Sequence, residues 1–138
     1  LILVGDGPPK ENLQELGKKL RGHRFKIIKA DYQEMPKIYR AADLFVLPSW
    51  EREAFGIVYL EAMASGLGVV APNDLVRFEI IGEAGILVNV TDSQKYAEAI
   101  KKGLYLDWKQ KAIKQASKFS WDKIGKLYEE AFKNLLIK

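Results

Sequence analysis

The chain has 138 residues, of which 48% are hydrophobic and 29% are charged, and this composition is typical of one globular domain. Because it contains no cysteine and only one histidine, disulfides, thiolate metal sites, cysteine nucleophiles and histidine metal clusters are excluded. The formal net charge is +4, but the basic residues are spread over predicted helix faces, which indicates solvated surface and no nucleic-acid interface.

The order of predicted strands and helices determines the expected fold class. In chain order, the predicted elements are a strand at 1–4, a helix at 10–20, a strand at 25–28, a helix at 33–41, a strand at 44–47, a helix at 56–65, strands at 69–71 and 86–88, a helix capped at 92–93, a helix at 107–118, and a last helix capped at 120. This alternation predicts an α/β fold, a Rossmann-like open parallel sheet of about five strands flanked by helices. Ligands of such sheets bind beyond the carboxyl ends of the strands, which selects the loops at 5–9, 29–34 and 48–57.

Two features that suggest other sites are set aside. The loop "GDGPP" at 5–9 follows a strand and precedes a helix, as a dinucleotide-binding loop does. However, the third glycine is missing and prolines stand where N–H donors are needed, so the loop is interpreted as a tight turn and not as an NAD site. The only histidine, His23, precedes a strand, which is the wrong end of the sheet for a ligand, and we expect it to be exposed.

The segment "EAFGIVYLE" carries two carboxylates, Glu53 and Glu61, with seven residues between them. The amides near Phe55, Gly56 and Ile57 lie at a predicted helix N-terminus, where unpaired N–H groups and the helix dipole favour an anion such as phosphate. Glu61 lies about one turn into that helix and can accept two hydrogen bonds from a vicinal diol. Glu53 precedes the helix and could bind sugar hydroxyls or stabilise positive charge.

A purely structural interpretation of the same carboxylates stays open at this point. Acidic side chains near a helix N-terminus are favourable by ~0.3–1 kcal/mol for electrostatic reasons alone. The spacing of the two glutamates therefore does not by itself separate a ligand site from helix-end electrostatics.

The segment "LPSWEREAFGIVYLEAMASGLGVVA" resembles the Glu-x7-Glu signature of the retaining glycosyltransferases of family 4, which have the GT-B fold. Four other segments are similar to this family in the same order, namely "LILVGDGP", "IYRAADLFVLPS", "EIIGEAGILVNVTDSQKYAEAI" and "FSWDKIGKLYEEAFKNLL". The resemblance covers nearly the whole chain.

The resemblance implies that residues 1–138 form a single nucleotide-sugar donor-binding domain, the C-terminal half of a GT-B enzyme. It implies that Glu53 contacts the transferred sugar as the catalytic residue and that Glu61 binds the donor ribose. The backbone at 55–57 would hold the sugar and diphosphate, and main chain near Ala30 would contact the base. The implied reaction is sugar transfer from a nucleoside diphosphate to an acceptor hydroxyl with retention of configuration.

Several parts of the family pattern are absent from the chain. The first strand of the donor domain, with its arginine and lysine, would precede Leu1, and so would the N-terminal acceptor domain. The family's proline after the signature helix is Gly68 here, and "PNDLVRF" replaces the glycine pair before Glu79. We therefore expect the chain alone to be inactive and to self-associate through an incomplete core or sheet edge. A non-catalytic nucleotide-binding or assembly domain of the same fold is the alternative.

The expected partner is a nucleotide sugar, linked to UDP, GDP or ADP, with no cofactor and no metal required. No apolar run approaches the ~20 residues that a membrane span needs, and the first residues lack the features of a signal peptide. The expected location is the cytoplasm, with peripheral membrane association of a full-length protein left open.

Overall fold

The computed structural model describes residues 1–49 and 53–136, and the chain divides into two compact units, Leu1–Met35 and Pro36–Lys138. In this described part of the chain, five strands form, all in parallel ladders, and helices flank them, so the predicted α/β class is confirmed. The strands pair as a two-stranded sheet, β1–β2, and a three-stranded sheet in the order β3–β4–β5.

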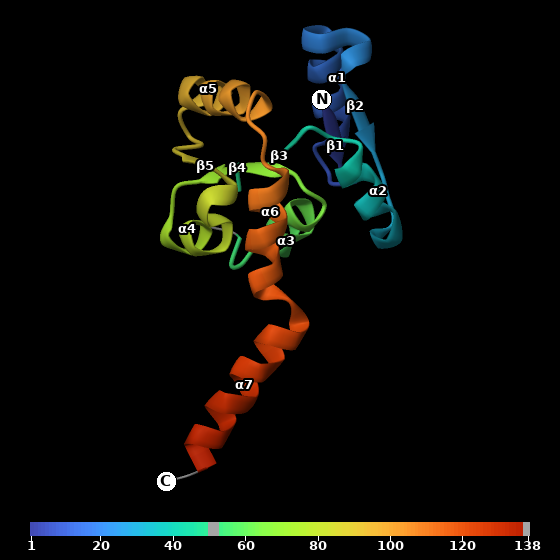
Figure 1. Ribbon diagram of the computed structural model, residues 1–138. Helices are drawn as coiled ribbons and strands as arrows, with labels where there is room; N and C mark the ends of the chain where they lie inside the picture. Colours follow the sequence, from blue (N-terminus) through green and yellow to red (C-terminus); the bar gives the residue numbers. More distant parts are fainter. Residues whose placement is uncertain (50–52, 137–138) are drawn as a thin grey trace. The chain divides into compact units, whose positions relative to one another are not determined.

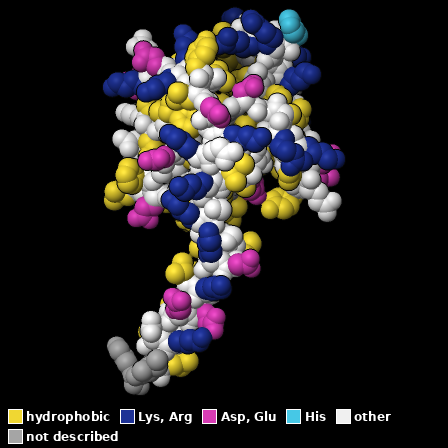
Figure 2. Space-filling view, in the orientation of Figure 1, with side chains coloured by type: hydrophobic (Ala, Val, Ile, Leu, Met, Phe, Trp, Pro, Cys, Tyr) yellow, Lys and Arg dark blue, Asp and Glu magenta, His cyan; other side chains and the backbone are white. Residues whose placement is uncertain are grey.

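The first unit consists of two strands and one long helix (Figure 1). Its elements are β1 (Ile2–Val4), α1 (Lys10–Arg21), β2 (Lys26–Ile28) and short 3-10 turns at Gly22–Arg24 and Tyr32–Glu34. Strand β1 pairs with β2 with Leu3 opposite Ile27. His23 is exposed, as the sequence predicts, and it appears in cyan in Figure 2.

The second unit contains the three-stranded sheet and the remaining helices. Its elements are α2 (Met35–Arg40), which begins at the boundary, β3 (Leu44–Val46), α3 (Ile57–Ala64), β4 (Gly68–Pro72), α4 (Leu75–Ile81), β5 (Gly85–Val88), α5 (Ser93–Leu104), α6 (Lys109–Ala116) and α7 (Trp121–Leu136). In Figure 1, α5 covers one face of the sheet, and α3, α4 and α6 lie on the other. The central strand β4 is buried throughout its length.

The core lies between this sheet and helix α3. Tyr59 and Met63 of α3 are fully buried and belong to the same hydrophobic cluster as Val69 and Ala71 of β4. Because one face of α3 is anchored in this way, the start of the helix is held at the carboxyl end of the sheet, where a ligand is expected. The helix ends at Ala64, and Gly66, two residues later, has the left-handed φ of 91° that is typical of a glycine just after a helix.

Helix α4 is an element that the sequence analysis did not predict. It begins after Asp74, whose Oδ1 accepts a hydrogen bond from the Arg77 N–H at 2.9 Å, and this is an N-cap. The signal that could have revealed it is an aspartate after a strand. Periodicity gave no help, because five of the seven residues in "LVRFEII" are apolar and no polar face marks out an apolar stripe.

Helix α7 has apolar side chains that the structure leaves exposed. The exposed apolar residues of the helix are Trp121, Leu127, Tyr128, Phe132, Leu135 and Leu136. Figure 2 shows hydrophobic side chains alternating with charged ones along this helix. Within the described part of the chain, no helix is both long enough and apolar enough to cross a membrane.

Candidate functional site

The predicted site lies where the chain enters α3 from strand β3. Gly56 occupies the N-cap position with φ 84° and ψ 59°, and its carbonyl accepts a hydrogen bond from the Tyr59 N–H at 2.9 Å. A Cβ at Gly56 would lie 2.5 Å from the Tyr59 ring, so only glycine fits this turn without a shift. No side chain of the described residues caps the helix start, and its first N–H groups are available to an anion.

Glu61 follows this start by one turn, as the sequence predicts. One of its carboxylate oxygens, Oε2, accepts a hydrogen bond from the Tyr39 hydroxyl at 2.9 Å. Tyr39 comes from α2 and is 4% exposed, while Glu61 itself is only partly buried. The bond therefore orients the carboxylate from the protein side and leaves oxygen lone pairs for a ligand.

Glu53 precedes the helix, and its side chain reaches the same helix start. Its Cγ lies 3.4 Å from the position that a Cβ on Gly56 would take. The pKa of the neighbouring Tyr59 hydroxyl is raised overall. Burial is the main cause, the Arg77 guanidinium opposes it, and the negative charge of Glu53 adds to it, so Glu53 lies close to Tyr59. The structure thus brings the two predicted carboxylates to one helix, Glu53 at its start and Glu61 one turn inside it.

Three aromatic side chains, Tyr39, Phe45 and Tyr59, pack together beside the two carboxylates. The Phe45 ring of β3 makes edge contacts with Tyr39, at a centroid distance of 5.7 Å, and with Tyr59, at 5.9 Å. The Tyr59 hydroxyl donates to the Leu47 carbonyl at 3.2 Å. Phe45 therefore packs against both tyrosines, the one that binds Glu61 and the one that faces Gly56.

The other predicted site residues differ in exposure and position. Phe55 is 42% exposed, and its ring makes an edge contact with Phe119 at 6.2 Å. Ile57 is 58% exposed, and Gly56 is buried. Ala30 belongs to the first unit, after β2, and its contact with a nucleotide base stays a prediction.

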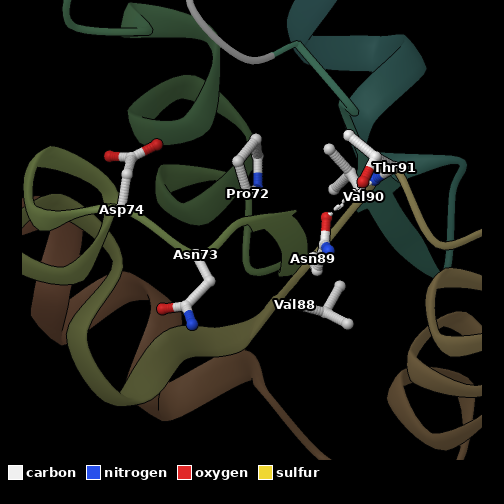
Figure 3. A pocket seen from close by; sticks show the side chains of 7 residues that line it. All are labelled: Pro72, Asn73, Asp74, Val88, Asn89, Val90 and Thr91. Carbon is white, nitrogen blue, oxygen red and sulfur yellow. Dashed lines mark hydrogen bonds between the residues drawn. The ribbon is translucent and has the colours of Figure 1, made fainter.

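A pocket of about 310 Å³ opens at the carboxyl ends of β4 and β5 (Figure 3). Pro72, Asn73 and Asp74 line one side of it. Val88 to Thr91 line the other, where the Asn89 amide oxygen accepts hydrogen bonds from the Thr91 N–H at 3.0 Å and hydroxyl at 2.7 Å. The pocket lies at the sheet edge that the sequence predicts for ligands, but sequence analysis selected neither of its loops.

Replacing Tyr39 by phenylalanine should lower the free energy of unfolding by about 1–2 kcal/mol. A hydrogen bond to a charged group contributes about 1.5–3 kcal/mol, and the exposed side of the Glu61 carboxylate regains water when the bond is lost. Urea unfolding measures the change. Tyr105, whose side chain is 90% exposed, supplies the control, and Tyr105→Phe should change stability by less than about 0.5 kcal/mol. Equal effects of the two variants would contradict a bond that holds Glu61.

The chain has a Rossmann-like α/β fold, and Glu53 and Glu61 lie at the helix start where a ligand is expected in such folds. The family model described as "Glycosyl transferases group 1" matches residues 1–105. The chain belongs to this family, and its fold is of the GT-B, Rossmann-like type.

Relatives and a solved structure agree with this assignment. The chain is 34% identical over 147 residues to an exopolysaccharide phosphotransferase of Streptomyces coelicolor, covering 99% of this chain and 15% of that protein. It is 35% identical over 95 residues to O-antigen chain mannosyltransferase B of Escherichia coli, covering 65% of this chain and 25% of that protein. The structure of sucrose-phosphate synthase from Thermosynechococcus elongatus matches with a TM-score of 0.76 and 26% identity, over 97% of this chain and 39% of that chain. The chain therefore spans a quarter or less of these two relatives.

Proposed function

We propose that this chain is the donor-binding part of a glycosyltransferase that moves a sugar from a nucleoside diphosphate to an acceptor hydroxyl, with retention. Membership of the glycosyl transferases group 1 family supports the reaction class. The observation that supports a donor site most strongly is the orientation of the Glu61 carboxylate. It accepts a hydrogen bond from the Tyr39 hydroxyl at 2.9 Å and lies one turn from a helix start that no side chain of the described residues caps. Such a carboxylate suits the ribose diol of a nucleotide.

In this proposal each group at the start of α3 has one role. The carboxylate of Glu61 accepts hydrogen bonds from the two ribose hydroxyls. The N–H groups beside Gly56 and Ile57, together with the helix dipole, bind the diphosphate and stabilise the charge that develops on it as it leaves. Glu53 lies on the sugar side, where its carboxylate stabilises positive charge on the sugar ring or accepts from a sugar hydroxyl. Main chain near Ala30 contacts the base.

The proposed reaction needs more than this chain supplies. We propose that the acceptor site and further cations for the diphosphate belong to another part of a longer protein, and that the chain alone transfers no sugar. Protein groups and helix N–H groups neutralise the diphosphate in this scheme, without a metal. We also propose that the isolated chain self-associates, because the apolar side chains of α7 are exposed.

Substitution of Glu61 tests the proposal directly. Glu61→Ala should weaken binding of the preferred nucleoside diphosphate by about 10- to 100-fold, since hydrogen bonds to a charged group contribute about 1.5–3 kcal/mol. Ligand-observed NMR with UDP, GDP and ADP at millimolar concentration gives the dissociation constants. Glu98→Ala, which removes an exposed glutamate of α5, is the matched control and should leave binding unchanged. Equal affinity of Glu61→Ala and Glu98→Ala would refute the ribose contact.

A further inference from the structure

Arg77 is a buried cation beside the proposed donor site, and the sequence analysis includes it only as part of "PNDLVRF", without a role of its own. It lies in α4 and is 4% exposed. Its Nη2 donates a hydrogen bond of 2.5 Å to the backbone carbonyl of Glu53, 24 residues earlier in the chain. Its Nη1 lies 3.4 Å from both carboxylate oxygens of Asp74. The guanidinium thus connects the segment before α3 to the loop after β4.

A buried guanidinium is an expensive means of stabilising a fold, because its desolvation cancels much of the attraction to its partner. Here the partner carboxylate of Asp74 is 38% exposed, and the Nε of Arg77 has no hydrogen-bond partner among the described residues. An apolar side chain of similar length would fill the same volume at lower cost. The contact that such a side chain could not replace is the hydrogen bond to the Glu53 carbonyl.

The position of that carbonyl matters for the proposed chemistry. Glu53 precedes Gly56, the N-cap residue of α3, by three residues, and the intervening segment makes no strand or helix. Within this segment, the Phe55 ring makes an edge contact with Phe119 at 6.2 Å. The bond from Arg77 holds the backbone of Glu53 and so restrains both the carboxylate of Glu53 and the turn that presents the α3 amides.

We infer that Arg77 is a positioning residue, which holds residues 53–56 in the conformation that receives the diphosphate and the sugar of the donor. This inference rests on the proposed function. Arg77 does not touch the ligand in this account; it acts through the Glu53 carbonyl, and Asp74 orients the guanidinium from the other side. The segment "PNDLVRF", which departs from the family's glycine pair, supplies both residues.

The inference predicts a selective loss of affinity. Arg77→Met should weaken binding of the preferred nucleoside diphosphate about tenfold and leave binding of the corresponding nucleoside within about twofold, because the ribose contact of Glu61 does not depend on the 53–56 turn. Arg77→Lys, which keeps one donor, should recover part of the loss. Arg40→Met, which removes an exposed arginine of α2, is the control and should change neither affinity.

A second measurement on the ligand-free 138-residue chain keeps the inference separate from the proposed function. Hydrogen exchange of the Tyr59 amide, which is bonded to the Gly56 carbonyl, should speed up about tenfold in Arg77→Met relative to the amides of β4. Unchanged relative exchange at Tyr59 in both Arg77→Met and Arg77→Lys would overturn the positioning role. So would an equal loss of nucleoside and nucleoside diphosphate affinity. If the wild-type chain binds no nucleotide, the proposed function fails, while the exchange result still decides the role of Arg77 in holding the turn.

Discussion

Replacing Gly68 by alanine is expected to destabilise the chain by about 3 kcal/mol, at the upper end of what overpacking costs. Gly68 begins the buried central strand β4, and a Cβ there would lie 2.2 Å from Cγ of the Trp108 ring. The ring cannot easily move, because it is 9% exposed and its Nε1 donates to the Gly103 carbonyl at 2.7 Å. The strand cannot shift either, since Gly68 pairs with Leu44 of β3.

Urea unfolding of Gly68→Ala measures this effect. The matched control is Gly125→Ala in α7, where a Cβ would meet nothing within 4 Å. Because glycine in a helix interior costs about 0.5–1 kcal/mol relative to alanine, the control should be neutral or slightly stabilising. A Gly68→Ala variant as stable as Gly125→Ala would mean that Trp108 does not pack against the strand. The contact also gives a physical reason for a glycine where the family has a proline, since the Trp108 ring occupies the space of a side chain.

Replacing Gly56 by alanine is expected to cost about 3 kcal/mol of stability and to abolish nucleotide binding. The left-handed φ of 84° costs a non-glycine residue about 1–2 kcal/mol. The added Cβ would also lie 2.5 Å from the Tyr59 ring, which is fully buried and packed on Phe45. Relief of this contact would rotate the helix start and displace the amides that we assign to the diphosphate.

Gly66→Ala separates the two contributions. Gly66 also has a left-handed φ, 91°, and the nearest neighbour of a Cβ there would be Cγ of the flexible Lys109 side chain at 3.3 Å, so this variant reports mainly the backbone cost, about 1–2 kcal/mol. The difference between the two variants in urea unfolding should therefore be about 1–2 kcal/mol and is due to Tyr59. Equal destabilisation of both variants, or a Gly56→Ala chain that binds nucleotide as the wild type does, would contradict this account of the turn.

The fold class was predictable from the sequence because its signals are local. Short apolar runs between turn residues predicted all five strands, and the helix of the signature segment was placed within one residue of α3 at each end. The pairing into two sheets was not predicted, since run length and periodicity carry no information on which strands are neighbours. Helix α4 was missed because its sequence, "LVRFEII", is apolar at five of seven positions and shows no amphipathic pattern.

The candidate site was predictable only in part, for a similar reason. The glutamate spacing and Gly56 predicted the start of α3 and the positions of both carboxylates. The residues that hold the carboxylates come from distant segments: Tyr39 is 22 residues from Glu61, and Arg77 is 24 residues from Glu53. Such contacts follow from packing of α2 and α4 around the sheet, which a single sequence does not reveal. The ligand contacts of Glu53, Phe55, Ile57 and Ala30 stay predictions.

Titration of the isotopically labelled chain with nucleoside diphosphates and their sugars, followed by amide NMR shifts, tests the central claim most directly. We predict that one of UDP, GDP and ADP shifts a set of amides clustered at residues 53–61, and that Glu61→Ala removes these shifts while Glu98→Ala keeps them. The absence of any shift at these residues with all three nucleotides at millimolar concentration would contradict a donor site at the start of α3. Shifts that persist unchanged in Glu61→Ala would contradict the ribose contact on which the site is built.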